Sequence, residues 1–289
     1  MSPDPFSRRR FLAVGGGAAL LAACGSTKSA SNGAPNASDD HFTQVAPGIV
    51  SIDLYASPKP QRFAFALTAK EGFASGVPVR VAIAPPGSKP THFVTADARG
   101  KGLPDFRGVY SIDATLDQAG IWSGMLDYQG TKSRFVFQVP KQHVSPIAGD
   151  PAPRAASPTV TNTLGVHPIC TRVPQCPLHT TSLADLIGKG RPVAVMFATP
   201  ARCQTRYCGP VLDTLLKLRP EYQDQIDFVH VEIYKNDQTT DLIPTVDAWG
   251  PLTGEPWLFG VDKTGVVTGR LDGAFDQTEM DALLKQLVS

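Results

Sequence analysis

Two patterns of apolar and polar positions divide this chain. From 42 to 140, apolar residues alternate with polar or small ones in short runs separated by glycine and proline. Alternation with a period of two is typical of strands that bury one face, and such runs lie at 48–54, 62–67, 77–83 and 133–139. Because no intervening run is long and periodic enough for a helix, the pattern predicts an antiparallel β-sandwich over 42–140.

The second pattern, from 163 to 289, combines apolar runs with apolar residues at helical spacing. A continuous apolar run at 193–199 is typical of a buried central strand, and residues 209–218 then place apolar side chains at helical spacing. Further strands are predicted at 226–233, 256–262 and 265–271, followed by an amphipathic helix at 276–287. This order predicts an α/β domain over 163–289, joined to the sandwich by a proline-rich linker at 141–162.

The N-terminus has the layout of an export signal. The sequence SRRRFL at 7–12 is followed by an uncharged run of 13 residues at 11–23, which is shorter than the roughly 20 residues needed to span a bilayer. The basic part resembles the twin-arginine export signal, and LAACG at 21–25 resembles the bacterial lipobox. These resemblances imply a signal peptide over 1–24 and lipidation of Cys24, which tethers the chain at the extracytoplasmic face of the cell membrane. Residues 25–41 are predicted to form a flexible linker.

Charge and cysteine content narrow the chemistry. The formal net charge is +1, so nothing indicates nucleic acid as a partner. The histidines of the first domain are scattered and have no cysteine near them, so we expect no metal site there and assign neither a metal nor a cofactor to the chain. Apart from Cys24 there are four cysteines, and in an oxidising compartment an even number indicates disulfides. Nearness in sequence favours Cys170 with Cys176, as a structural loop clamp, and Cys203 with Cys208, although three pairings are open.

A family resemblance rests on several segments of the second domain. Six features of this domain together resemble the membrane-anchored bacterial thioredoxin-like proteins. They are SLADL at 182–186, GRP at 190–192, VAVMFAT at 193–199, a cysteine after this run, GPVLD at 209–213 and EPWLF at 255–259. The resemblance covers 163–289 and implies a thioredoxin-like fold and thiol–disulfide exchange with protein thiols or disulfides of the cell envelope. It also implies that Cys203 is the attacking cysteine, Cys208 the resolving one and Pro256 a cis-proline beside them. In the first domain, DQAGIW at 117–122 resembles the end of many immunoglobulin-like modules.

The cysteine spacing departs from the family's CxxC motif, because four residues separate Cys203 from Cys208. In a regular helix, residues five apart are separated by a rise of about 7.5 Å, which is too far for a disulfide. A bridge therefore requires Cys203 to lie outside the regular helix or the first turn to unwind. A thiolate at a helix N-terminus is stabilised by unpaired N–H groups, so we expect Cys203 near the helix start. Cys208 is expected deeper in the helix, about one turn beyond the usual resolving cysteine of the family and beside Leu212 and Leu215.

Three other functions stay open at this point. The Cys203–Cys208 pair is also compatible with a permanent staple in a non-catalytic envelope lipoprotein. Cys170 and Cys176, flanked by His167 and His179, suggest a copper chaperone as the metal-binding alternative. The spacing Thr205-x-x-Cys208 resembles the peroxiredoxin motif, with the preceding proline displaced by one position, and suggests a thiol peroxidase.

Overall fold

The computed structural model describes residues 45–69, 72–74, 76–103, 108–203, 206–236, 238–250, 252 and 254–289. The predicted signal peptide, the lipidation site Cys24 and the spacer up to residue 41 lie outside the described residues. Among the residues described, no helix combines the length and the apolar character that crossing a membrane requires.

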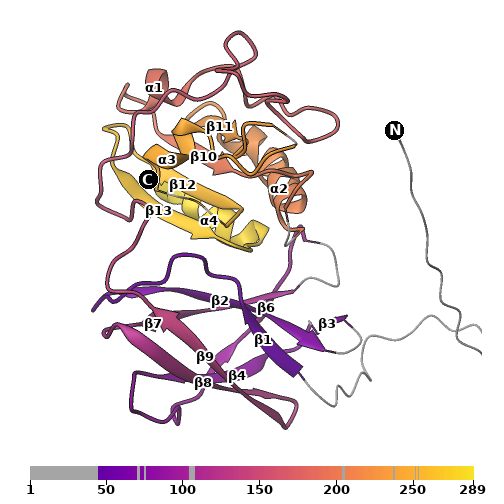
Figure 1. The fold of residues 1–289 in the computed structure, drawn as a ribbon, viewed down its shortest axis with the longest axis vertical. Helices are drawn as coiled ribbons and strands as arrows, with labels where there is room; N and C mark the ends of the chain where they lie inside the picture. Colours follow the sequence, from indigo (N-terminus) through magenta and orange to yellow (C-terminus); the bar gives the residue numbers. More distant parts are fainter. Residues whose placement is uncertain are drawn as a thin grey trace, which may run out of the picture. The chain divides into compact units, whose positions relative to one another are not determined.

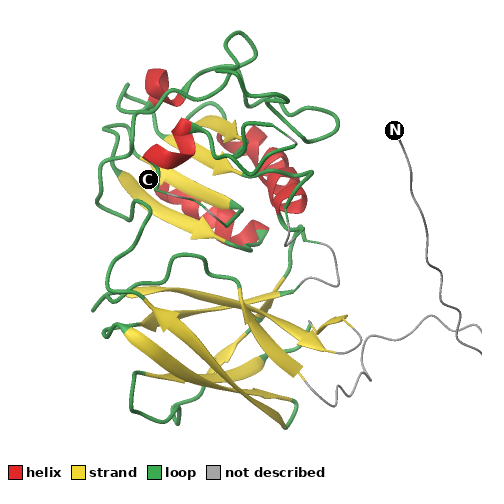
Figure 2. Ribbon diagram, in the orientation of Figure 1, coloured by secondary structure: helices red, strands yellow, loops and turns green. Residues whose placement is uncertain are grey.

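The first half of the described chain is built from strands alone (Figures 1 and 2). One antiparallel sheet has the order β1-β2-β7-β6, with β3 paired to β2, and the other has the order β5-β4-β8-β9. The expected β-rich character of this half is confirmed. The strands are β1 (Val45–Ile49), β2 (Pro60–Ala69), β3 (Gly72–Ala74), β4 (Val79–Ala84), β5 (Val94–Ala96), β6 (Ala98–Arg99), β7 (Val109–Thr115), β8 (Gly120–Tyr128) and β9 (Thr131–Val139).

Strand β2 contributes to two cores, because both of its faces are covered. Phe63, Phe65 and Leu67 point into the core between the two antiparallel sheets, together with Val81 of β4. Ala64, on the opposite face, belongs to the core that contains helices of the second half. Successive side chains of a strand point to opposite faces. Residues 63–67 are therefore all buried, although they pack into two different cores.

The second half has one mixed sheet with helices on both faces (Figure 1). The strand order is β11-β10-β12-β13; β10 runs parallel to β11, and β12 is antiparallel to both β10 and β13. The strands are β10 (Val193–Phe197), β11 (Asp227–Val231), β12 (Trp257–Val261) and β13 (Val267–Asp272). The helices are α1 (Leu183–Leu186), α2 (Cys208–Tyr222), α3 (Pro244–Ala248) and α4 (Gln277–Val288).

The apolar run of β10 is explained by the helices on either side of the sheet. Ala194 and Met196 pack in a core with residues of α2 and α4, whereas Val193, Val195 and Phe197 pack in a core with residues of α1 and α3. A strand covered on both faces cannot alternate between apolar and polar positions. The sheet and its two helical layers thus fix the carboxyl end of β10, from which the cysteine segment departs.

Buried charges connect the two halves. Arg270 on β13 places its Nη1 atom 2.7 Å from Oδ2 of Asp53 and donates through Nη2 to the Asp53 carbonyl oxygen. Arg62 on β2 pairs with Glu279 on α4 at 2.7 Å between Nε and Oε1. Between the halves, the residues predicted as a linker pair with β13, since the amide of Val267 donates to the Asp150 carbonyl oxygen at 2.9 Å. This segment is therefore held along the edge of the second sheet.

A candidate disulfide site at the start of helix α2

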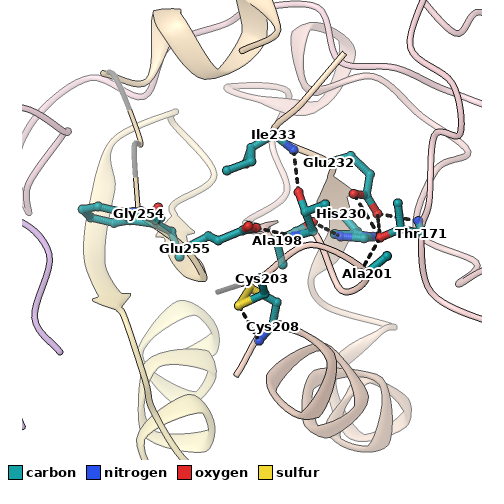
Figure 3. The surroundings of a disulfide bond; sticks show 12 residues. Thr171, Ala198, Ala201, Cys203, Cys208, His230, Glu232, Ile233, Gly254 and Glu255 are labelled. Carbon is teal, nitrogen blue, oxygen red and sulfur yellow. Dashed lines mark hydrogen bonds between the residues drawn. A yellow bond between two sulfur atoms is a disulfide. The ribbon is translucent and has the colours of Figure 1, made fainter. Parts of the chain in front are cut away.

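A disulfide joins Cys203 to Cys208 (Figure 3). Their Cα atoms are 5.9 Å apart, which lies within the usual range for disulfides. This separation is shorter than a regular helix allows for residues five apart, so Cys203 and Cys208 are not both part of one regular helix. The sequence-based pairing of these two cysteines agrees with the structure.

The two cysteines occupy different kinds of backbone. Cys203 lies in a turn after β10, where its amide donates to the Thr199 carbonyl oxygen at 3.0 Å. Helix α2 begins only at Cys208. Of the two options that the spacing left open, the structure shows Cys203 outside the regular helix. The expectation that Cys208 lies deeper inside the helix is wrong, because α2 begins at Cys208 itself.

Exposure distinguishes the two sulfur-bearing residues. Cys203 is 8% exposed and Cys208 is fully buried, where it belongs to the same core as Leu212 and Leu215 of α2. The Cys208 amide, an N–H at the start of the helix, donates to Sγ of Cys203 at 3.3 Å. Helix N-terminal amides stabilise negative charge, so this contact favours a thiolate on Cys203 when the disulfide is reduced.

Glu255 is the polar residue closest to the disulfide that the sequence did not single out. One of its carboxylate oxygens and the two sulfurs all lie within 4.8 Å of one another. The side chain is 7% exposed, and it accepts a hydrogen bond from the Thr199 amide. Burial raises the pKa of Glu255 to about 7, although the hydrogen bonds from Thr199 act in the opposite direction. Its carboxyl group therefore exchanges protons near neutral pH.

Pro256 follows Glu255 directly and leads into β12. The Glu255–Pro256 peptide bond is cis, as the resemblance implies, and the Pro256 carbonyl oxygen accepts a hydrogen bond from the Gly273 amide at 2.9 Å. Strand β12 pairs with β10, and this pairing brings the residue before the proline to the disulfide. A glutamate before a proline has no local sequence signal of such a role, because the contact depends on strand pairing.

Arg202, next to Cys203, is held by the loop that follows β11. Its Nη1 atom donates to the carbonyl oxygen of Asn236 at 2.9 Å and to that of Thr239. The guanidinium carbon also lies 4.9 Å from the centre of the Tyr234 ring. These contacts fix the loop after β11 against the cysteine turn.

The predicted disulfide between Cys170 and Cys176 is absent. Both are buried free cysteines, and the prediction from nearness in sequence is corrected accordingly. Their surroundings give the physical reason: Sγ of Cys176 lies 3.3 Å from Nε2 of His179 and 3.3 Å from Nδ1 of His230. Each thiol thus has imidazole partners, so no S–S bond is needed to satisfy the buried sulfurs.

His230 is the member of this cluster that sequence analysis missed. It lies in β11, is fully buried and is paired in register with Met196 of β10. A histidine inside an otherwise apolar strand was the available signal, but its partners are more than fifty residues earlier in the sequence. His167, which was considered together with His179, is exposed and does not belong to the cluster.

The charges in the cluster depend on one another. The hydrogen bond between the two thiols lowers the pKa of Cys170 and raises that of Cys176. Burial lowers the pKa of His179. Burial also acts to lower the pKa of His230, but the hydrogen bond with Cys170 and the charge of Glu232 more than offset it and leave that pKa raised. The cluster therefore has a thiolate character that attracts positive charge.

One residue connects this cluster with the disulfide segment. The amide and the hydroxyl of Thr171, which follows Cys170, donate to Oε1 of Glu232 at 2.6 and 3.0 Å. The same hydroxyl oxygen accepts a hydrogen bond from the Ala201 amide at 3.1 Å (Figure 3). The loop that carries Cys170 and the turn that carries Cys203 therefore share a hydrogen-bond network.

No protein-family model matches this chain, and no curated protein matches its sequence. The function must therefore be argued from the residues of the chain and their geometry.

Proposed function

We propose that this protein is a thiol–disulfide oxidoreductase that acts through Cys203 and Cys208. The observation that carries the proposal is a disulfide at the start of α2, with a carboxyl group of pKa about 7 beside its sulfurs. A structural staple needs no proton donor or acceptor, whereas thiol–disulfide exchange does, because the thiolate is the attacking species. The resemblance of 163–289 to thioredoxin-like proteins supports the same chemistry.

The exposure of the two sulfurs assigns their roles. A substrate thiolate attacks Sγ of Cys203, the more exposed partner; the Cys203–Cys208 bond breaks and Cys208 leaves as a thiolate. The Glu255 carboxyl group gives its proton to that thiolate. A second substrate thiolate then attacks the substrate sulfur of the mixed disulfide, which releases an oxidised substrate and Cys203 as a thiolate. The substrate loses two electrons, and the protein disulfide gains them.

The reverse direction uses the same groups. The Cys203 thiolate, stabilised by the Cys208 amide, attacks a substrate disulfide, forms a mixed disulfide and releases one substrate sulfur as a thiolate. The Glu255 carboxylate then takes the proton of the Cys208 thiol, and the resulting thiolate attacks Sγ of Cys203, which re-forms the Cys203–Cys208 bond and releases the second substrate thiolate. The substrate disulfide gains the two electrons that the protein dithiol loses. The cell envelope is the proposed location, with the chain tethered through lipidated Cys24, and protein thiols or disulfides are the proposed partners.

Trapping distinguishes catalysis from a permanent staple. Cys208→Ser should accumulate a mixed disulfide between Cys203 and substrate, because attack proceeds and release does not. Cys203→Ser is the matched control, since it removes the sulfur of the less buried cysteine and should form no such adduct. The measurement is non-reducing electrophoresis and mass spectrometry after incubation with a model peptide disulfide. If Cys208→Ser forms no more adduct than Cys203→Ser, and the wild-type pair does not cycle, the proposed function is wrong.

A further inference from the structure

We propose that Cys170, Cys176, His179 and His230 form a four-coordinate Zn²⁺ site that is separate from the disulfide. The four ligand atoms all lie within 4.8 Å of one another. The sequence suggested copper as an alternative for Cys170, Cys176 and His179 together with His167, but it did not indicate His230 or a zinc site. The inference does not rest on the proposed oxidoreductase function, because it uses none of Cys203, Cys208 or Glu255.

The distances between ligand atoms resemble the edges of a tetrahedron around zinc. With zinc bonds of about 2.0–2.1 Å to nitrogen and about 2.3 Å to sulfur, tetrahedral ligands are separated by about 3.3 Å for two nitrogens and about 3.6 Å for nitrogen and sulfur. Nδ1 of His230 lies 3.1 Å from Nε2 of His179. It lies 3.3 Å from Sγ of Cys176 and 3.8 Å from Sγ of Cys170. The ligand atoms thus surround a space of the size that one such ion occupies.

The ligand types and the burial favour zinc over harder cations. Two thiolates and two neutral imidazoles are a common ligand set of structural zinc sites, whereas Mg²⁺ and Ca²⁺ prefer oxygen ligands. All four residues are buried, with the largest exposure, 7%, at Cys170. Two thiolate charges balance the charge of Zn²⁺, so the occupied site is neutral, as burial requires. Binding releases the thiol protons and involves no oxidation or reduction.

Hydrogen bonds with neighbouring groups orient ligand side chains of the cluster. Nε2 of His230 lies 2.9 Å from the Ala198 carbonyl oxygen, which only accepts. The Nε2 atom therefore carries the donated proton, and Nδ1 faces the cluster as the atom available to a metal. The Cys176 amide contacts Sγ of Cys170 at 3.5 Å, and Thr171 anchors the adjacent backbone to Glu232.

The site also accounts for the order of an irregular loop. Cys170, Cys176 and His179 lie in a segment without helix or strand, whereas His230 lies within β11. A shared metal ion attaches this loop to the central sheet at three points, which is the role expected of a closed structural site. Because Thr171 also contacts Ala201, the same ion stabilises the approach to the Cys203 turn.

Metal content of the full-length protein tests the assignment. The chain is purified from membranes without chelators, and zinc and copper are measured by mass spectrometry; about one zinc per chain is expected. Cys176→Ser and His179→Gln should each lose most of the zinc. His92→Gln, at an exposed histidine, is the matched control and should retain it. The double variant Cys203→Ser/Cys208→Ser should also retain zinc, which separates this proposal from the redox function.

A second measurement does not depend on variants that fold. Wild-type protein is stripped with a chelator and titrated with Co²⁺, which should produce the visible absorption of tetrahedral cobalt together with thiolate-to-cobalt charge transfer. Wild-type protein that contains no zinc and gives no such spectrum overturns the proposal, as does a Cys170–Cys176 disulfide found by non-reducing peptide mapping. Stoichiometric copper in place of zinc overturns the assignment of the metal.

Discussion

The raised pKa of Glu255 predicts how the stability of the folded protein changes with pH. The substitution Glu255→Gln removes the ionisable group but keeps an oxygen that accepts the hydrogen bond from the Thr199 amide. Burial raises the pKa of this carboxyl group from 4.5 to about 7 in the folded protein. Between these two values the folded state holds a proton that the unfolded state has lost, so the group makes stability fall as pH rises.

The magnitude follows from the difference between the two pKa values. A pKa raised by about 2.5 at about 1.4 kcal/mol per pKa unit corresponds to about 3 kcal/mol. The loss begins near pH 4.5 and is complete above about pH 7, where the folded state must also ionise. Glu255→Gln does not carry this penalty, so its free energy of unfolding relative to wild type should increase by about 2 to 3 kcal/mol between pH 5 and pH 8.

The assay is urea unfolding of the oxidised proteins at pH 5 and pH 8, without reductant. Glu221→Gln, at an exposed glutamate of α2, is the control and should keep the wild-type dependence on pH. If Glu255→Gln and wild type differ by the same free energy at both pH values, the carboxyl group is ionised normally and the reasoning fails.

The same variant tests the proton-transfer role. Glu255→Gln should slow thiol–disulfide exchange and remove a component of its pH dependence centred near pH 7, because glutamine neither accepts nor donates the proton of Cys208. An unchanged exchange rate and pH profile would show that solvent supplies the proton.

The remaining predictions concern the anchor and a helix end. Cys24→Ala should release the protein from the membrane fraction, and continued membrane association of this variant contradicts the proposed anchor. Asp276→Ala removes the side chain that caps α4 through the amides of Thr278 and Glu279, and should lower the free energy of unfolding by about 1 kcal/mol. Asp276→Asn, which keeps a capping oxygen, should cost less in the same urea experiment; equal costs contradict the assignment of the cap.

The disulfide illustrates what local sequence could supply. An apolar run, a following helical pattern and two nearby cysteines were enough to locate Cys203 and Cys208, and the distance argument left two options, Cys203 outside the regular helix or an unwound first turn. The helix start was misplaced because the turn before α2 has no periodic pattern of its own. The turn is fixed by closure of the disulfide and by the hydrogen bonds that the amides of Arg202 and Cys203 donate to the Thr199 carbonyl oxygen.

The partners of both cysteine clusters depended on contacts between distant segments. Glu255 reaches the sulfurs because β12 pairs with β10. His230 reaches Cys176 because the loop that carries Cys176 lies along β11, where the Leu178 carbonyl oxygen accepts a hydrogen bond from the His230 amide. The sequence does not identify either set of partners, since the residues involved are about fifty positions apart. Nearness in sequence therefore predicted a disulfide where the structure instead assembles two cysteines and two histidines.

The sequence by itself determined the local elements: the β-rich first half, the buried strand β10 and the final amphipathic helix. These follow from periodicity and turn chemistry, which are short-range properties. Only the tertiary structure decided which face of β2 packs against the second half, which carboxyl group lies beside the disulfide, and which histidines surround the free cysteines. Those choices depend on burial and on the pairing of distant strands, because only the folded chain brings such groups within contact distance.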